Sequence, residues 1–275
     1  MNARTVWRLK AAGRRVLPAG IRRAIGSSLA RTRGPWQVAF ASPAPQPIDP
    51  ARTGVLGTGW QDPSIPERQR PVFDALLAQM KAGRAREDFA ALAEAVRLTG
   101  VHDPRILEVG CSTGWNAEVL EFLLKRPVRY LGVDYSVAMV QSARRRYARH
   151  AFVAGDAAAL PFASASYDIV VSGSCLLHVA EYGAAIAESR RVSARWCVFH
   201  TVPIDVDRPT MALRKGAYGA PVLELVFNEG ELLSLFSRAG LAVRRVLPSI
   251  TLDYLASVVG AAVPTRTYVC ECLSV

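Results

Sequence analysis

No stretch of this 275-residue sequence holds the run of about 18 apolar residues that a membrane-spanning helix needs. The five cysteines include no C-x-x-C pair and the four histidines are scattered, so we see no zinc signature and expect no metal. An odd number of cysteines without framework spacing is typical of reduced, mostly buried thiols and indicates a cytoplasmic protein. The G-x-G-x-x-G spacing is also missing, which argues against a dinucleotide-dependent oxidoreductase.

Acidic residues are absent from residues 1–48, which carry nine basic residues. The other 227 residues hold 25 basic and 23 acidic groups, so the net charge of +11 belongs to this N-terminal arm. Apolar residues at helical spacing over 16–29 predict two short helices, and five prolines over 34–50 predict an extended, loosely tethered linker. An Arg-rich, acid-free start is also typical of an organelle transit peptide, whereas a secretory signal would need an apolar core.

The arm is compatible with three roles. A basic, partly amphipathic segment can lie on an anionic membrane surface, here through residues 1–33, and so attach a cytoplasmic protein to the inner membrane face. It can instead serve only as a solubilising extension, or bind nucleic acid. We place nucleic acid last, because the interleaved aromatic residues of RNA-binding surfaces are missing.

Short apolar runs alternate with helical segments after residue 104, which is typical of βαβ units. The runs lack polar alternation, as in strands that are covered on both faces. We therefore predict an α/β fold with a Rossmann-like, doubly wound sheet of seven mostly parallel strands and helices on both faces. The expected domains are a basic arm and linker over 1–48, a helical cap over 49–103, and a core over 104–275 with an insertion at 203–227.

The first predicted strand runs directly into a turn of small residues that opens a helix. Gly110 and Gly114 allow the backbone to turn tightly and approach a ligand, and the helix start offers free N–H groups. Asp134 ends the next strand and Asp156 follows the third. Because the carboxyl ends of parallel strands share one edge of the sheet, these residues predict a crevice for a small molecule.

Four segments carry a family resemblance: Glu108-Val-Gly-Cys-Ser-Thr-Gly114, Gly132-Val-Asp-Tyr-Ser136, Gly155-Asp-Ala157 and Leu176-Leu-His178. They resemble the class I S-adenosylmethionine-dependent methyltransferases, in particular the small-molecule, quinone-biosynthesis-like group called methyltransferase type 11. The resemblance covers about residues 104–200, weakens over 229–273 and is absent from the arm. It implies that the cofactor is S-adenosylmethionine.

By that resemblance, Glu108 and the two glycines would hold the methionine end of the cofactor, Asp134 the ribose and Asp156 the adenine. The full set of expected cofactor-binding residues is Glu108, Gly110, Cys111, Ser112, Gly114, Asp134, Tyr135, Met139, Asp156, Ala157 and Ser172. Ser112 stands where these enzymes usually have the middle glycine of the loop, and we expect this small residue to be tolerated.

The resemblance implies methyl transfer to a small-molecule, lipid-linked or glycan acceptor. His178, just beyond the fourth strand, is the candidate catalytic residue, as a general base, although a structural histidine at a helix start is an equal alternative. Two other functions stay open: a non-catalytic S-adenosylmethionine-binding protein and a nucleic-acid methyltransferase. The second is disfavoured, because Ser172-Gly173-Ser174-Cys175 replaces the Asn/Asp-Pro-Pro-aromatic motif of base-methylating relatives.

The G-x-S-x-G pattern over 110–114 also matches the nucleophile elbow of α/β-hydrolases. That fold is disfavoured, because the preceding 50 residues have a helical pattern and no histidine follows His200. We interpret Asp168 as a structural cap, and we consider His200 and Thr201 secondary candidates for function.

Two further groups are expected near the site. Trp60, Gln61, Arg68 and Gln69 either close over the cofactor or pack the cap. The 203–227 insertion should lie over the acceptor and set specificity, because loops on this edge often carry function. Toward its far end the insertion holds Arg214, Lys215, Tyr218 and Glu224, followed by Asn228.

Overall fold

The computed structural model describes residues 44–49 and 53–273, and every structural statement below concerns these residues. The helices predicted over 16–29 lie outside them, as does most of the Pro-rich linker. Among the helices that are described, none has both the length and the apolar character needed to cross a membrane.

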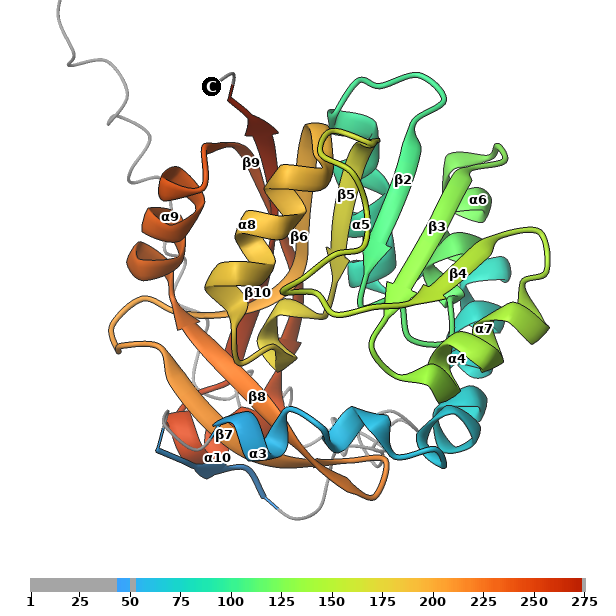
Figure 1. The fold of residues 1–275 in the computed structure, drawn as a ribbon. Coiled ribbons are helices and arrows are strands. Elements are labelled where there is room, and N and C mark those ends of the chain that lie inside the picture. Colours follow the sequence, from blue (N-terminus) through green and yellow to red (C-terminus); the bar gives the residue numbers. More distant parts are fainter. Residues whose placement is uncertain (1–43, 50–52, 274–275) are drawn as a thin grey trace, which may run out of the picture. The chain divides into compact units, whose positions relative to one another are not determined.

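Seven strands form the central sheet, in the spatial order β4 (Ala151–Ala154), β3 (Arg129–Asp134), β2 (Arg105–Val109), β5 (Tyr167–Gly173), β6 (Ser193–Asp205), β10 (Val263–Cys272) and β9 (Leu241–Leu252) (Figure 1). The pairs from β4 to β6 are parallel, whereas β10 is antiparallel to both β6 and β9. The predicted α/β class and the mostly parallel, Rossmann-like sheet are confirmed.

Helices cover both faces of this sheet, which explains why its strands lack polar alternation (Figure 1). In β5, Ile169 and Val171 belong to one apolar cluster, whereas Val170, between them, belongs to another on the opposite face. The first cluster includes residues of α5 (Glu87–Leu98), α6 (Trp115–Leu124) and α7 (Val137–Arg146), and the second includes residues of α8 (Tyr182–Val192) and α9 (Glu229–Arg238).

The insertion forms a β-hairpin that widens the sheet. Its strands β7 (Met211–Ala217) and β8 (Ala220–Asn228) are joined by Tyr218 and Gly219, which both have positive φ, as a tight two-residue hairpin turn requires. β8 also pairs in parallel with the last residues of β6. With β1 (Gln46–Pro47), which pairs with β7, the described sheet has ten strands.

The end of the predicted linker is therefore not loosely tethered, which corrects that expectation for residues 44–49. Gln46 and Pro47 pair antiparallel with β7, and the Ile48 N–H donates to the Ala212 carbonyl at 2.9 Å. The physical reason is that β7 forms an edge whose backbone groups need partners. Proline fits such an edge because its missing N–H can face away from the ladder.

The segment before β2 contains α3 (Thr53–Leu56), the 3-10 helix η2 (Gly59–Gln61), α4 (Ile65–Lys81) and α5. α4 contacts α6 and α7, whereas α5 packs against β6, β9 and β10 and so joins the helical layer of the sheet. The division of the chain into arm, cap and core at residues 48 and 103 stays a prediction.

Candidate functional site

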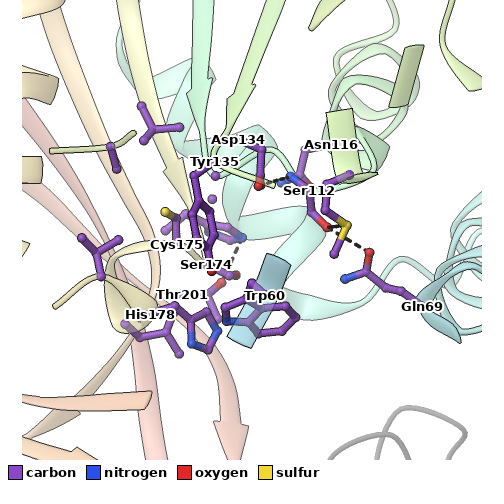
Figure 2. Close-up of a pocket in the computed structure, with 18 of the residues that line it drawn as sticks. Trp60, Gln69, Ser112, Asn116, Asp134, Tyr135, Ser174, Cys175, His178 and Thr201 are labelled. Atoms are coloured by element: carbon purple, nitrogen blue, oxygen red, sulfur yellow. Dashed lines mark hydrogen bonds between the residues drawn. The ribbon is translucent and has the colours of Figure 1, made fainter. Parts of the chain in front are cut away.

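A cavity of about 360 Å³ lies at the carboxyl ends of five parallel strands, β2 to β6 (Figure 2). Residues at or just after the ends of β2 to β5 line it: Gly110 and Ser112, Asp134 and Tyr135, Gly155 to Ala158, and Ser174 and Cys175. Thr201 lines it from within β6, one residue beyond the position that pairs with the end of β5. This is the edge at which open α/β sheets bind their ligands.

The loop after β2 has the geometry that its small residues predict. Gly110 has φ +72°, and a Cβ there would lie 2.4 Å from the Cys175 Cβ. Gly114 has φ +82° and begins α6, and a Cβ there would lie 2.7 Å from the Phe152 ring. Ser112 also has a positive φ, +51°, which explains why glycine is usual at this position in the resembling family.

Asp134 connects two loops at the floor of the cavity. Its carboxylate accepts the Ser112 N–H at 2.8 Å and the Ser136 N–H at 2.9 Å. Burial raises the pKa of Asp134 to about 6, against the effect of these two hydrogen bonds. The side chain lines the cavity, so an acidic group is held there in a fixed position.

Glu108 lies beneath the loop and is fully buried. It accepts hydrogen bonds from Asn116 Nδ2 at 2.6 Å and from the Tyr130 hydroxyl, and burial raises its pKa to about 7. Gly173 packs directly on it, since a Cβ at Gly173 would be 2.0 Å from Glu108 Oε1. Glu108 does not line the cavity, whereas Asn116 does. Asn116, near the start of α6, was not among the expected ligands.

The structure brings most of the expected site residues together. Those that line the cavity are Gly110, Ser112, Asp134, Tyr135, Met139, Asp156, Ala157 and His178. Those that are buried around it without lining it are Glu108, Cys111, Gly114 and Ser172. The cofactor contact assigned to each of these residues stays a prediction.

His178 lies on the 3-10 helix η3 (Leu176–His178), and its Nδ1 is 2.6 Å from the Leu223 carbonyl oxygen of β8. Because a carbonyl only accepts, Nδ1 carries the hydrogen and Nε2 keeps its lone pair. Burial, reinforced by the charge of Lys215, lowers the pKa of His178 to about 4. The imidazole is therefore neutral at physiological pH, with the Trp60 ring 4.8 Å away.

Two of the four residues expected to cover the site line the cavity, Trp60 and Gln69. Gln69 Oε1 accepts the Ser112 hydroxyl at 2.9 Å, which ties α4 to the loop after β2 (Figure 2). Gln61 and Arg68 do not line it, and Arg68 donates instead to the Tyr218 carbonyl at 2.7 Å. Within the described residues, the Trp60 indole nitrogen is the one buried side-chain polar atom without a hydrogen-bond partner.

The remaining candidates differ in position. Asp168 lies at the opposite ends of the strands, where it accepts the Arg105 N–H at 2.8 Å and pairs with its guanidinium. His200 lines the cavity, but both its ring nitrogens have partners, Thr267 and Thr201, each at 2.9 Å. These contacts fit structural roles for Asp168 and His200.

Backbone strain is concentrated at the cavity. Seven described residues other than glycine have positive φ, and four of them line it: Ser112, Ser174, Thr201 and Tyr218. Conformations of this kind cluster at active sites and ligand clamps, where surrounding contacts maintain them. The observation supports the cavity as the functional site.

Comparisons with known proteins agree with this geometry. Residues 107–196 match a family model described as a methyltransferase domain. A probable S-adenosylmethionine-dependent methyltransferase of Mycolicibacterium smegmatis is 30% identical, over 52% of this chain and 53% of its own length. A demethylmenaquinone methyltransferase of Renibacterium salmoninarum is 32% identical, over 45% of this chain and 50% of its own length. The chain thus spans about half the length of these curated relatives.

Among solved structures, the 1,6-didemethyltoxoflavin-N1-methyltransferase of Burkholderia thailandensis has a TM-score of 0.55 and 17% identity, covering 85% of this chain and 97% of its own. That enzyme was crystallised with its acceptor and S-adenosylhomocysteine, and at this identity it supports the fold alone. The comparisons confirm the expected resemblance: residues 107–196 match a methyltransferase domain, and the chain is similar to S-adenosylmethionine-dependent methyltransferases.

Proposed function

We propose that this protein transfers a methyl group from S-adenosylmethionine to a small-molecule acceptor. The observation that carries the proposal is that one cavity is lined by acidic residues and a tight glycine turn on one side, and by a lysine, a histidine and a tryptophan on the other. The loops after β2, β3 and β4 supply the backbone turn at Gly110 and the acids Asp134 and Asp156. Lys215 of the hairpin, His178 and Trp60 line the other end.

The donor end suits the cofactor chemically. The Asp134 carboxylate can accept the two ribose hydroxyls, and Asp156 and Ala157 can contact the adenine. Gly110, with its positive φ, lets the loop turn tightly where the methionine end would lie. When bound, S-adenosylmethionine supplies an electrophilic methyl group on a cationic sulfur. The protein's main contribution is then to hold donor and acceptor in line at contact distance.

The walls of the acceptor end favour an aromatic or lipid-like acceptor over a glycan. Trp60, Phe89, Tyr218, Ile250 and Leu252 line the cavity, and such side chains stack or pack against apolar groups. The more specific choice between a lipid-linked acceptor and a free aromatic one stays a prediction.

His178 is the proposed proton acceptor. Since its pKa of about 4 makes it a weak base, we expect His178→Ala to lower the rate of methyl transfer by about a hundredfold, the lower end of general-base effects. The assay is mass spectrometry of cell extract incubated with the protein and methyl-labelled S-adenosylmethionine. His102→Ala, at an exposed position, is the matched control and should leave the rate unchanged. Equal rates for both variants would contradict the role of His178.

The same assay separates the proposal from its alternatives. A labelled small molecule that forms only with the protein present supports it. If the folded protein binds S-adenosylhomocysteine but yields no labelled product, a non-catalytic binding protein is the better description. Label in nucleic acid would favour a nucleic-acid methyltransferase.

Donor binding should weaken in acid. The pKa of Asp134 is raised to about 6, so below that pH the carboxyl group is protonated and loses acceptor capacity for the ribose hydroxyls. We expect the dissociation constant of S-adenosylhomocysteine to rise about tenfold from pH 7 to pH 5, roughly a factor of ten per pH unit below the pKa. Calorimetric titration measures this.

Two features sharpen that test. The Glu108 carboxyl also has a raised pKa, about 7, so the Asp134→Asn variant is the control that isolates Asp134. It should bind weakly at all pH values and lack the step near pH 6. For the unliganded protein the sign is opposite: a raised carboxyl pKa makes the group's stability contribution fall as pH rises from about 4 to about 6.

Residues 1–33 of the arm lie outside the described residues. Contact of residues 1–33 with an anionic membrane surface, a cytoplasmic location and peripheral attachment to the inner membrane face therefore stay predictions.

A further inference from the structure

A buried charged cluster stands at the acceptor end of the cavity. Lys215 of β7 and Glu224 of β8 are 3% and 0% exposed, and they form an ion pair. Lys215 Nζ also donates to the Tyr254 hydroxyl at 2.9 Å, and that hydroxyl donates to Glu224 Oε1 at 2.5 Å. Tyr254 lies on the 3-10 helix η4 (Asp253–Leu255).

The cluster presents its ammonium group to the cavity and keeps its acid behind it. Lys215 and Tyr254 line the cavity, whereas Glu224 does not. Glu224 accepts from both neighbours, so it holds the ammonium and the phenol in position. The single hydrogen of the Tyr254 hydroxyl is donated to Glu224, so the charged donor that a ligand atom meets at this wall is the Lys215 ammonium group.

Fold stability does not explain the cluster well. Taking an ion pair out of water costs about as much free energy as the pair returns, and apolar residues of similar size often serve better. The rest of the hairpin follows that preference, since Leu213, Val222, Leu223 and Leu225 are all buried and apolar. A cation retained here, facing a cavity, points to recognition of a ligand.

Charge is also divided along the sheet. Asp134 ends β3 and Asp156 follows β4, whereas Lys215 lies on β7, on the other side of β5 and β6 in the strand order. Three further charged residues line the cavity: Arg86 and Asp88, which pair with each other, and Glu181. A cationic sulfonium donor suits the first side, and an anionic acceptor suits the second. The Lys215 charge reaches other residues of the cavity, because it contributes to the lowered pKa of His178.

We propose that Lys215 forms an oxyanion-binding subsite that holds an ionised oxygen of an aromatic acceptor, with Glu224 and Tyr254 as the positioning residues. This inference rests on the proposed function, because it takes the bound molecule to be the methyl acceptor. The ligand that this subsite fits has an anionic oxygen beside a flat apolar ring, because Trp60 and Tyr218 supply aromatic walls at the same end of the cavity. A phenolate and an aromatic carboxylate are its two possible sources.

The test compares charged probes with neutral ones of similar shape. Protein saturated with S-adenosylhomocysteine is titrated at mildly alkaline pH with 4-nitrophenol against nitrobenzene, and with benzoate against benzamide. Calorimetry or ligand-observed NMR gives the affinities. We expect at least one anion to bind about tenfold more tightly than its neutral counterpart, a difference of about 1.4 kcal/mol. Preference for nitrophenolate alone assigns a phenol, and preference for benzoate alone assigns a carboxylate.

The decisive variant is Lys215→Met combined with Glu224→Gln. Lys215→Met alone would leave a buried carboxylate without its cation and endanger folding. The double variant should bind S-adenosylhomocysteine like the wild type and lose the anion preference. Tyr254→Phe keeps the charge and should reduce the preference about threefold. Lys81→Met removes a lysine whose side chain is 54% exposed and should change nothing.

Three results would overturn the subsite: equal affinities for anions and neutral probes, no anion binding, or a preference that survives in the double variant. Failure of the proposed function looks different, because wild type would then not bind S-adenosylhomocysteine. The anion titrations are repeated without that ligand, so the subsite is decided in either case.

Discussion

Replacing Asp134 with alanine should raise the dissociation constant of S-adenosylhomocysteine about a hundredfold. The carboxylate is expected to accept two ribose hydroxyls, and hydrogen bonds to a charged group contribute about 1.5 kcal/mol or more each. Losing two of them corresponds to about 2.8 kcal/mol, or two factors of ten. The same change leaves the N–H groups of Ser112 and Ser136 without their acceptor, which loosens both loops.

Asp168→Ala is the matched control for this measurement. Asp168 is also an acid at a strand end, but it pairs with Arg105 at the opposite ends of the strands. Calorimetry should give this variant the wild-type affinity. If Asp134→Ala bound as tightly as Asp168→Ala, the donor end of the cavity would be wrongly assigned.

Replacing Gly173 with alanine should lower the free energy of unfolding by about 3 kcal/mol, the upper range for overpacking. The new Cβ would overlap Glu108 Oε1, at 2.0 Å, and crowd Asn116 Nδ2, at 3.0 Å. Glu108 cannot swing aside, because Asn116 and Tyr130 both hold its carboxylate. For a chain of this size the melting temperature should fall by roughly 6–12 °C, measured by thermal unfolding.

A double-mutant cycle identifies the cause. In a Glu108→Ala background the overlapping oxygen is gone, so Gly173→Ala should cost at least about 1 kcal/mol less than in wild type. Gly54→Ala is the control substitution, because a Cβ at Gly54 has no atom within 4 Å. Additive effects of the Glu108 and Gly173 substitutions would show that this contact does not set the cost.

The sequence predicted the geometry of the loops after β2 and β3 well because its determinants are local. The first predicted strand corresponds to β2, and the glycines at 110 and 114 that follow it have positive φ. Asp134 ends the next strand along the chain. Each of these features depends on residues close in sequence and on the rule that parallel strand ends share an edge.

The acceptor end was predicted only as a location. Lys215 and Glu224 were named in the insertion, but their partner Tyr254 lies 39 residues beyond Lys215 and joins them through tertiary packing. The anchoring of His178 by the Leu223 carbonyl has the same origin. Such contacts have no periodicity or spacing in the sequence, so pattern reasoning does not reach them.

Asn116 shows a different limit of prediction from the sequence. It lies within the segment that carries the resemblance, yet its role as the link between Glu108 and the cavity follows from where its side chain points. The pairing of Gln46 with β7 was missed because proline-rich composition predicts extension but not the edge that receives it.

The hairpin of β7 and β8 is anchored on three sides: by β6 at its end, by β1 along its outer edge and by Arg68 at its Tyr218 turn. Its residues contribute Lys215 and Tyr218 to the cavity but none of the donor-side loops. Under the proposed function, the residues that contact the acceptor from the hairpin and those that contact the donor therefore lie in separate stretches of chain. We expect exchange of the hairpin, with its anchors kept, to change acceptor preference and to leave donor binding unchanged.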